Sequence, residues 1–245
     1  MTTLKPQKPR STTIKSDKTR LPRLTRSRRL FRSLTRIVCR IVLWLLADVE
    51  ATGIGNIPQH GPALIVTNHI GDADGLLVIA YSPYHFDWLA KSELYDIPIL
   101  GNIIDAYGVI WIHRGQPDRR ALRAALEGFA EDRCIGIAPE GRESLTGSLE
   151  AGTFGAAYLA LKADVTLYPV TFTGTMNKNV FSNIKRLQRT KISVTFGLPF
   201  RLDAHGDRRT SMQRGTQTIM ETLARQLPLN YQGEYKFVTE TGNDG

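Results

Sequence analysis

The feature that most constrains the fold of this chain is a regular alternation, beginning after Gly53, of short apolar runs with longer helical stretches. Runs with the length and β-branched content of strands lie at residues 63–67, 109–112, 134–138, 165–173 and 192–196. Helical spacing of apolar residues is found at residues 117–132, 153–163 and 211–227. Pro117 and Asp118 are expected to begin the first of these helices and Ser211 to cap the last. We therefore predict an α/β fold, with a mixed, largely parallel sheet flanked by helices.

Residues 23–50 precede this pattern and are predicted to form an amphipathic helix. An apolar stripe at helical spacing consists of Leu30, Leu34, Ile37, Ile41 and Trp44. The opposite side carries Arg29, Arg32, Arg36 and Arg40. The longest apolar run, residues 41–47, is much shorter than the roughly 20 residues that cross a bilayer, and no signal-peptide cleavage site is visible. We predict a membrane-associated, interfacial helix. The alternatives are a surface helix packed on the domain and a mitochondrial-type transit peptide.

The positive charge of the chain is concentrated at its start. Residues 1–40 hold 13 Lys and Arg and one acid, a net of +12, whereas the remaining 205 residues hold 19 basic and 22 acidic groups, a net of −3. The slightly acidic domain argues against a nucleic-acid partner, and the basic segment is expected to meet the anionic lipids of a membrane surface. We predict a peripheral or monotopic protein on the cytoplasmic side of a membrane.

The composition also predicts how the chain is divided. Residues 1–22 are polar and aperiodic, with three prolines, and are predicted to be a disordered basic tail. The domain is expected to occupy residues 51–230, followed by a loose tail over residues 231–245. Cys39 and Cys134 lie in apolar stretches and are interpreted as small buried hydrophobes in a reducing compartment. No histidines and acids show a spacing typical of metal ligands, so no metal site is predicted.

Polar residues follow the first predicted strand directly. In α/β sheets, ligands and catalytic groups collect at the carboxyl ends of strands. His69 lies there, and a tight turn could bring the carboxylate of Asp74 to the imidazole N–H, which leaves the other ring nitrogen as a general base. Asp72 is a second candidate for the carboxylate that binds the imidazole. The alternative is a simple polar turn in which Asp74 is the N-cap of the next helix.

Three further blocks follow strands. Arg114 ends the run at 109–112 and offers a guanidinium fork suited to phosphate or carboxylate. The segment 139–144 follows the next strand, and Gly141 within it permits close backbone approach. Pro169 interrupts the strand at 165–173, which argues for a sheet edge or a bend near a site.

In order and context, the four blocks resemble the motifs of the glycerolipid acyltransferase family, the lysophosphatidate-type acyltransferases. The family's motifs are N-H-x4-D, G-x-I-[FW]-I-x-R, [FVI]-P-E-G-[TR]-x-S and V-P-[VI]. The matching residues are Asn68, His69 and Asp74; Gly108, Ile110, Trp111, Ile112 and Arg114; Pro139, Glu140, Gly141 and Ser144; Pro169 and Val170. The resemblance covers about residues 53–200 and is specific as a set.

The resemblance implies the glycerolipid acyltransferase fold and transfer of a fatty acyl group from acyl-CoA or acyl-carrier protein, without a cofactor, to the hydroxyl of a lysophospholipid. The first candidate acceptor is 1-acylglycerol-3-phosphate, which gives phosphatidate. The catalytic residues would be His69 and Asp74. The substrate-binding residues would be Asn68, Arg114, Glu140, Gly141, Arg142 and Ser144. Glu140 is unusual for an anion site and is expected to orient Arg114, Arg142 or backbone N–H groups.

Two departures from the family pattern bear on the acceptor. Arg142 lies one residue earlier than the arginine of many members, and Glu143 takes its place. Residues 152–155 also supply no lysine where members commonly have one. These departures leave open an acyltransferase for another lyso-lipid and a non-catalytic membrane lipid-binding protein. Two further alternatives are a soluble acyltransferase of another fold that also uses a histidine and a nearby aspartate, and a polyanion binder that uses the basic tail.

Overall fold

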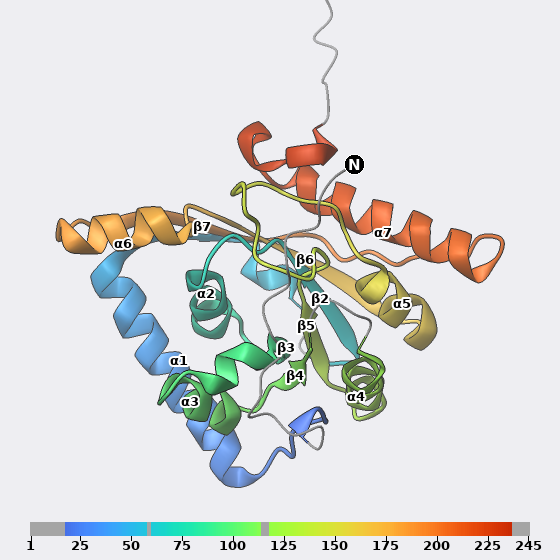
Figure 1. The fold of residues 1–245 in the computed structure, drawn as a ribbon, viewed down its shortest axis with the longest axis horizontal. Helices are drawn as coiled ribbons and strands as arrows, with labels where there is room; N and C mark the ends of the chain where they lie inside the picture. Colours follow the sequence, from blue (N-terminus) through green and yellow to red (C-terminus); the bar gives the residue numbers. More distant parts are fainter. Residues whose placement is uncertain (1–17, 58–59, 114–117, 237–245) are drawn as a thin grey trace, which may run out of the picture.

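The computed structural model describes residues 18–57, 60–113 and 118–236. In this part of the chain, seven strands form one sheet in the order β1-β7-β6-β2-β5-β3-β4 (Figure 1). The strands are β1 (Ala47–Thr52), β2 (Ala63–Thr67), β3 (Asp87–Lys91), β4 (Ile110–Ile112), β5 (Cys134–Ile137), β6 (Thr166–Thr173) and β7 (Thr190–Phe196). Every neighbouring pair is parallel except β6 and β7, which are antiparallel. The prediction of a mixed, largely parallel sheet is confirmed.

Helices cover both faces of this sheet. They are α1 (Arg26–Leu46), α2 (Ala73–Tyr81), α3 (Leu100–Tyr107), α4 (Arg119–Ala130), α5 (Phe154–Ala163), α6 (Asn177–Lys185) and α7 (Arg208–Arg225). Short 3-10 helices lie at η2 (Ile54–Asn56), η3 (Ser92–Asp96), η4 (Leu229–Tyr231) and η5 (Gly233–Tyr235). One core cluster packs α4, α5 and α7 on β2 and β5, and a second packs α1 and α2 on the other face. Cys39 and Cys134 are buried in the second cluster, as predicted.

The structure corrects several predicted boundaries. The helix predicted over residues 23–50 begins at Arg26 and ends at Leu46, because residues 47–52 form the edge strand β1 and pair in parallel with β7. Asp118 caps α4 as predicted, but the N-cap of α7 is Asp207, which accepts the N–H of Thr210. Ser211 instead bonds the backbone of His205 through its hydroxyl.

Parts of both predicted tails are packed on the domain. Residues 18–22 are ordered because Lys18 pairs with Asp105 at 3.0 Å and the carbonyl of buried Pro22 accepts a hydrogen bond from Arg133. Residues 231–236 are held by the hydroxyls of Tyr231 and Tyr235, which accept backbone N–H groups. The tail predictions are wrong for these segments, and residues 1–17 and 237–245 lie outside the described residues.

Helix α1 packs on the domain through its arginines. Arg28 donates to the carbonyls of Asp105 and Ala106 in the last turn of α3. Arg36 and Arg40 donate to the carbonyls that end α2, at Ile79 and Ala80. Cations near the exposed carbonyls of a helix C-terminus satisfy those groups and interact favourably with the helix dipole. This row of arginines therefore fixes the angle at which α1 crosses α2 and α3.

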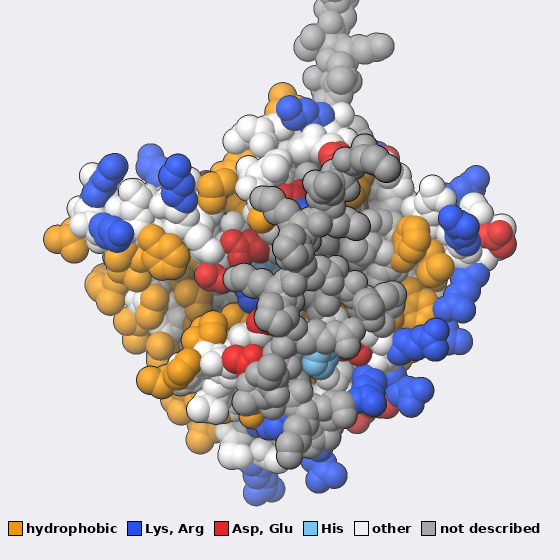
Figure 2. Space-filling model, viewed as in Figure 1, with side chains coloured by type: hydrophobic (Ala, Val, Ile, Leu, Met, Phe, Trp, Pro, Cys, Tyr) orange, Lys and Arg blue, Asp and Glu red, His pale blue; other side chains and the backbone are white. Residues whose placement is uncertain are grey.

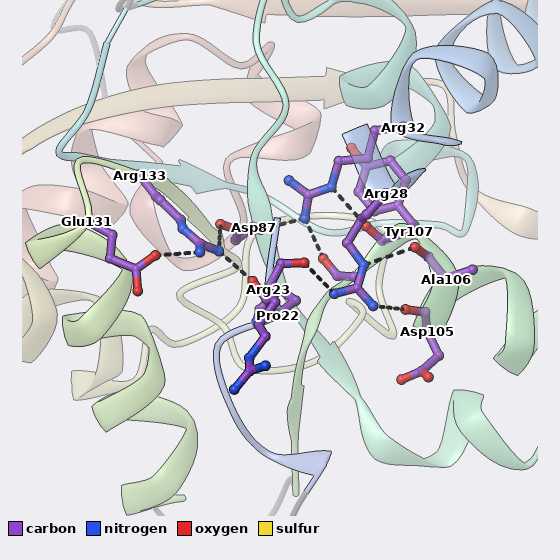
Figure 3. A network of polar contacts seen from close by, with 11 residues as sticks. Pro22, Arg23, Arg28, Arg32, Asp87, Asp105, Ala106, Tyr107, Glu131 and Arg133 are labelled. Carbon is purple, nitrogen blue, oxygen red and sulfur yellow. Dashed lines mark hydrogen bonds and ion pairs between the residues drawn. The ribbon is translucent and has the colours of Figure 1, made fainter. Parts of the chain in front are cut away.

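Arg32 is the buried centre of this row. Its guanidinium pairs with Asp87 at 2.5 Å and donates to the carbonyls of Tyr107 and Gly108 (Figure 3). The second oxygen of Asp87 accepts from Arg133 at 3.3 Å. Both members of the Arg32–Asp87 pair are only 2% exposed, so each charge depends on its partner.

The apolar stripe of α1 consequently faces outward. Its residues are 51–70% exposed: Leu30, Leu34, Ile37, Val38, Ile41, Trp44 and Leu45. Apolar side chains gather along this edge of the molecule (Figure 2). Arg32, Arg36 and Arg40 of the predicted cationic face bind groups of the domain itself, and Arg32 is buried. Within the described residues, no helix combines the length and the hydropathy needed to cross a membrane.

Replacing the buried guanidinium should destabilise the fold strongly. We expect Arg32→Ala to lower the free energy of unfolding by about 3–5 kcal/mol, because a buried carboxylate loses its closest partner. The control is Arg29→Ala, which removes an exposed arginine of the same helix and should change stability by less than about 0.5 kcal/mol. Urea unfolding followed by circular dichroism measures both. Equal losses in the two variants would contradict the assignment.

Candidate active site

His69 and Asp74 lie together where β2 gives way to α2. The imidazole Nδ1 is 2.9 Å from Oδ2 of Asp74, and the same oxygen accepts the N–H groups of Ile70 and Gly71. Asp74 is 4% exposed, whereas the His69 side chain is 25% exposed. Asp72 is exposed and makes no side-chain cap bond. The structure therefore pairs Asp74, and not Asp72, with the histidine.

This arrangement determines what the imidazole can do. A carboxylate at Nδ1 assigns the proton to that nitrogen and leaves Nε2 as the acceptor. The negative charge of Asp74 is held by two backbone N–H groups and by the first turn of α2, where the helix dipole favours an anion. A histidine oriented in this way can take a proton from a hydroxyl, and the carboxylate stabilises the imidazolium that results.

The loop after β5 holds the backbone of His69 from two sides. Oε1 of Glu140 accepts the His69 N–H at 3.2 Å, and the N–H of Ser144 donates to the His69 carbonyl at 2.7 Å. Oε2 of Glu140 accepts the N–H of Glu150 at 2.8 Å. Among the roles expected for Glu140, the structure shows the orientation of backbone N–H groups, those of His69 and Glu150. Burial raises the pKa of this carboxyl to about 7.

The other residues predicted in this loop mainly shape it. Gly141 adopts a left-handed conformation with φ +72°. Arg142 pairs with Glu150 at 2.5 Å, so its charge is already compensated, and it does not contact Glu140 as one expectation had it. The hydroxyl of Ser144 donates to the Ser148 carbonyl at 2.6 Å. The Ser144 hydroxyl therefore forms a hydrogen bond within the loop.

Asn68 joins two strands below the histidine. Its side-chain amide donates to the carbonyl of Phe172 at 3.0 Å and its oxygen accepts the N–H of the same residue at 2.8 Å. With 1% exposure and both side-chain polar groups bound to Phe172, Asn68 positions the end of β2 against β6. Sequence spacing gave no signal for this pairing, which spans 104 positions.

The remaining two blocks have different outcomes. Arg114 lies outside the described residues. Pro169 is not at a sheet edge as one interpretation had it, because β6 lies between β2 and β7. Its missing N–H is tolerated because pairing with β7 begins only at Val170, and the Pro169 carbonyl accepts the N–H of Gly197 at 2.8 Å.

A second histidine–aspartate pair lies next to the undescribed segment. His113 Nδ1 is 3.2 Å from Oδ2 of Asp118, which also accepts the His113 N–H. The five-residue separation equals that of His69 and Asp74, and this repeated spacing was the available signal. Asp118 also caps α4, so this pair ties the end of β4 to that helix.

The fold and this site define an acyltransferase. The sequence model of the family described as Acyltransferase matches residues 48–173, just over half of the chain. The chain belongs to this family.

Relatives within the family are named for acyl transfer to lipids. The chain is 34% identical over 155 residues to the 1-acyl-sn-glycerol-3-phosphate acyltransferase of Borreliella burgdorferi, which covers 60% of this chain and 62% of the relative. It is 31% identical over 138 residues to the lyso-ornithine lipid O-acyltransferase of Pseudomonas aeruginosa, covering 54% and 52%. The chain thus spans about three-fifths or less of the length of these curated relatives.

A solved structure shows the same fold. The crystal structure of the 1-acyl-sn-glycerophosphate acyltransferase from Thermotoga maritima superposes with a TM-score of 0.61. It covers 82% of this chain and 84% of its own, at 20% identity. The expectation of a glycerolipid acyltransferase fold is confirmed.

The buried carboxyl of Glu140 should make stability depend on pH. Its pKa rises from 4.5 to about 7 on folding, so the folded state holds the proton more tightly and stability falls as the pH rises through this window. We expect the free energy of unfolding to decrease by up to about 3 kcal/mol between about pH 4.5 and 7, and Glu140→Gln to lack most of this decrease. Urea unfolding across the window, with exposed Glu127→Gln as control, measures it. An unchanged slope in Glu140→Gln would refute it.

Proposed function

We propose that the protein transfers a fatty acyl group from acyl-CoA or acyl-carrier protein to the free hydroxyl of a lysophospholipid. The first candidate acceptor is 1-acylglycerol-3-phosphate, with phosphatidate as the product. The observation that carries the proposal is the 2.9 Å contact between His69 Nδ1 and buried Asp74 at the carboxyl end of β2. Family membership and the names of the relatives support the same reaction class.

In this mechanism the acceptor attacks the donor directly. Nε2 of His69 takes the proton of the acceptor hydroxyl while its oxygen attacks the thioester carbonyl. Asp74 stabilises the imidazolium. The intermediate then expels the thiolate, which takes the proton back from His69, so an ester replaces the thioester. Burial raises the pKa values of Cys39 and Cys134, that of Cys134 to about 11, which argues against either as a nucleophile.

A second acceptor class is favoured by the loop after β5. Arg142 is paired with Glu150, and Glu143 stands where many family members have an arginine. A site with less free positive charge suits a head group other than a phosphate monoester. A lyso-aminolipid of the lyso-ornithine type is therefore the second candidate, in line with the name of one relative.

The first test compares His69→Ala with wild type. Purified protein is incubated with oleoyl-CoA or oleoyl-carrier protein and each lyso-acceptor, and thiol release is followed. We expect release that requires an acceptor, and a loss of roughly 10²- to 10⁴-fold in His69→Ala. Asp74→Asn should also lose most activity, whereas Asp72→Asn should retain it. Wild type that releases no thiol with any donor and acceptor would instead indicate a non-catalytic lipid-binding protein.

We further propose that α1 attaches the enzyme peripherally to the cytoplasmic leaflet of a membrane. The exposed apolar stripe supports this, since burial of apolar area drives interfacial binding. Near the N-terminal end of this helix, exposed arginines recur at every third position: Arg20, Arg23, Arg26 and Arg29. Each cation near an anionic leaflet contributes about 1 kcal/mol. These arginines, and not the inward row, would meet anionic lipids.

The membrane proposal is tested without disturbing the arginine row. In the triple variant Leu34→Gln, Ile37→Gln and Ile41→Gln, each residue is about half exposed, so folding should be preserved. We expect flotation with phosphatidylglycerol-containing vesicles to weaken at least about tenfold. Leu198→Gln, an exposed leucine outside α1, is the matched control. Equal vesicle binding by the triple variant and the control would exclude this stripe as the attachment site.

A further inference from the structure

Helix α6 meets the sheet across a polar cavity. No residue of α6 is buried, although the helix has nine residues. Asn179, Ser182, Asn183 and Arg186 recur at steps of three, one and three, which places them on one face of the helix. With Gly174 and the first residues of β7 they line a cavity of about 370 Å³, called here the α6 pocket. A helix with no buried residue gains little from apolar burial, and Asn183 donates to the hydroxyl of Thr190 at 3.2 Å, which holds α6 against β7 beside the cavity.

The α6 pocket is positively charged. Its cations are Arg186, Arg189 and Lys191, and no carboxylate lines it. Arg189 donates to the carbonyl of Ala47, where α1 passes into β1. Across the described part of the chain, neither Arg186 nor Lys191 forms an ion pair with a carboxylate. Basic side chains gather over α6 in Figure 2. Unpaired cations beside amides and hydroxyls favour a phosphate ligand.

The pocket opens at the same edge of the sheet as the histidine. Gly174 follows β6, which runs parallel to β2, and Thr190 begins β7, which runs antiparallel to β6. At about 4.8 Å between strands, β7 lies about 10 Å from β2. The side chain of Asn177, at the start of α6, accepts the N–H of Asp72 at 3.0 Å, which links the pocket's helix to the loop after His69.

The pocket also lies on the opposite side of β2 from the blocks expected to hold the acceptor. In the sheet, β6 and β7 lie on one side of β2, and β5, β3 and β4 lie on the other (Figure 1). The loop of Glu140 follows β5. Two substrates that meet at His69 can therefore approach from opposite sides without competing for the same cations.

We propose that the α6 pocket binds the phosphate groups of the nucleotide part of acyl-CoA, with Arg186 and Lys191 as the binding cations. This inference rests on the proposed function and specifies the donor within it. The pantetheine arm would extend from the pocket across β6 to bring the thioester to His69. The pocket residues take no part in the chemical step.

The test uses donors with and without phosphates. Activity is measured with oleoyl-CoA and with S-oleoylpantetheine for wild type and the double variant Arg186→Gln/Lys191→Gln. We expect the double variant to lose about tenfold or more in kcat/KM for the CoA thioester and nothing for the pantetheine thioester. Arg214→Gln, an exposed arginine on α7, is the matched control and should preserve both values. An equal loss with both donors, or no loss with either, would overturn the proposal.

Binding of free CoA tests the α6 pocket independently of the proposed acyl transfer. Titration calorimetry of CoA into the full chain requires no turnover or acceptor. Binding by wild type that is lost in the double variant supports the pocket even where no acceptor is turned over. Failure of wild type to bind CoA overturns the pocket, even where acyl-carrier protein serves as donor.

The phosphate of a lipid head group is the alternative ligand for the cations of the α6 pocket. Flotation of wild type and the double variant is compared on phosphatidylcholine vesicles with and without phosphatidylglycerol. We expect equal vesicle binding by the two proteins. A double variant that loses binding to the anionic vesicles, while its preference for CoA over pantetheine is unchanged, would make the pocket a lipid head-group site and overturn the donor assignment.

Discussion

The carboxylate of Asp87 is buried at the start of β3 between the guanidinium groups of Arg32 and Arg133. Arg32 comes from α1 and Arg133 from the segment that enters β5, and the latter also binds the carbonyl of Pro22. One charge therefore joins the N-terminal segment, α1 and two strands of the sheet. Since an unpaired buried charge is very costly, these parts are held in a single relative arrangement.

This constraint explains the unusual position of α1. Its arginines are used to satisfy Asp87 and the carbonyl ends of α2 and α3, so the helix cannot also turn its main apolar stripe to the core. Cys39 and Leu43 alone supply its deeply buried apolar contacts. The exposed stripe is thus a consequence of how the helix is fixed. It is exposed without any rearrangement of the domain.

Much of the sheet and the contact between His69 and Asp74 could be predicted from the sequence, for identifiable reasons. Buried strands such as β2 and β5 are continuous apolar runs, and His69 and Asp74 are close enough in sequence for one turn to join them. Edge strand β1 is only six residues long and has a single β-branched apolar residue, Val49, so its pairing with β7 could not be predicted from the local sequence. The periodicity of α1 defined two faces but not which one packs, because the partners of Arg32 lie at least 55 positions away.

Long-range contacts also determine the geometry of the site. Asn68 contacts Phe172 and Glu140 contacts His69 over long sequence separations, and both contacts position the backbone at the histidine. The backbone around His69 is held from both β6 and the loop after β5, which fixes the position of the imidazole in the middle of the sheet edge. The loop after β5 lies on one side of this point, and α6 with the start of β7 lies on the other. These two regions also contact each other, because the side-chain amide of Asn177 donates to Glu143 at 3.0 Å and its oxygen accepts the N–H of Asp72, so a change on one side of the histidine can reach the other.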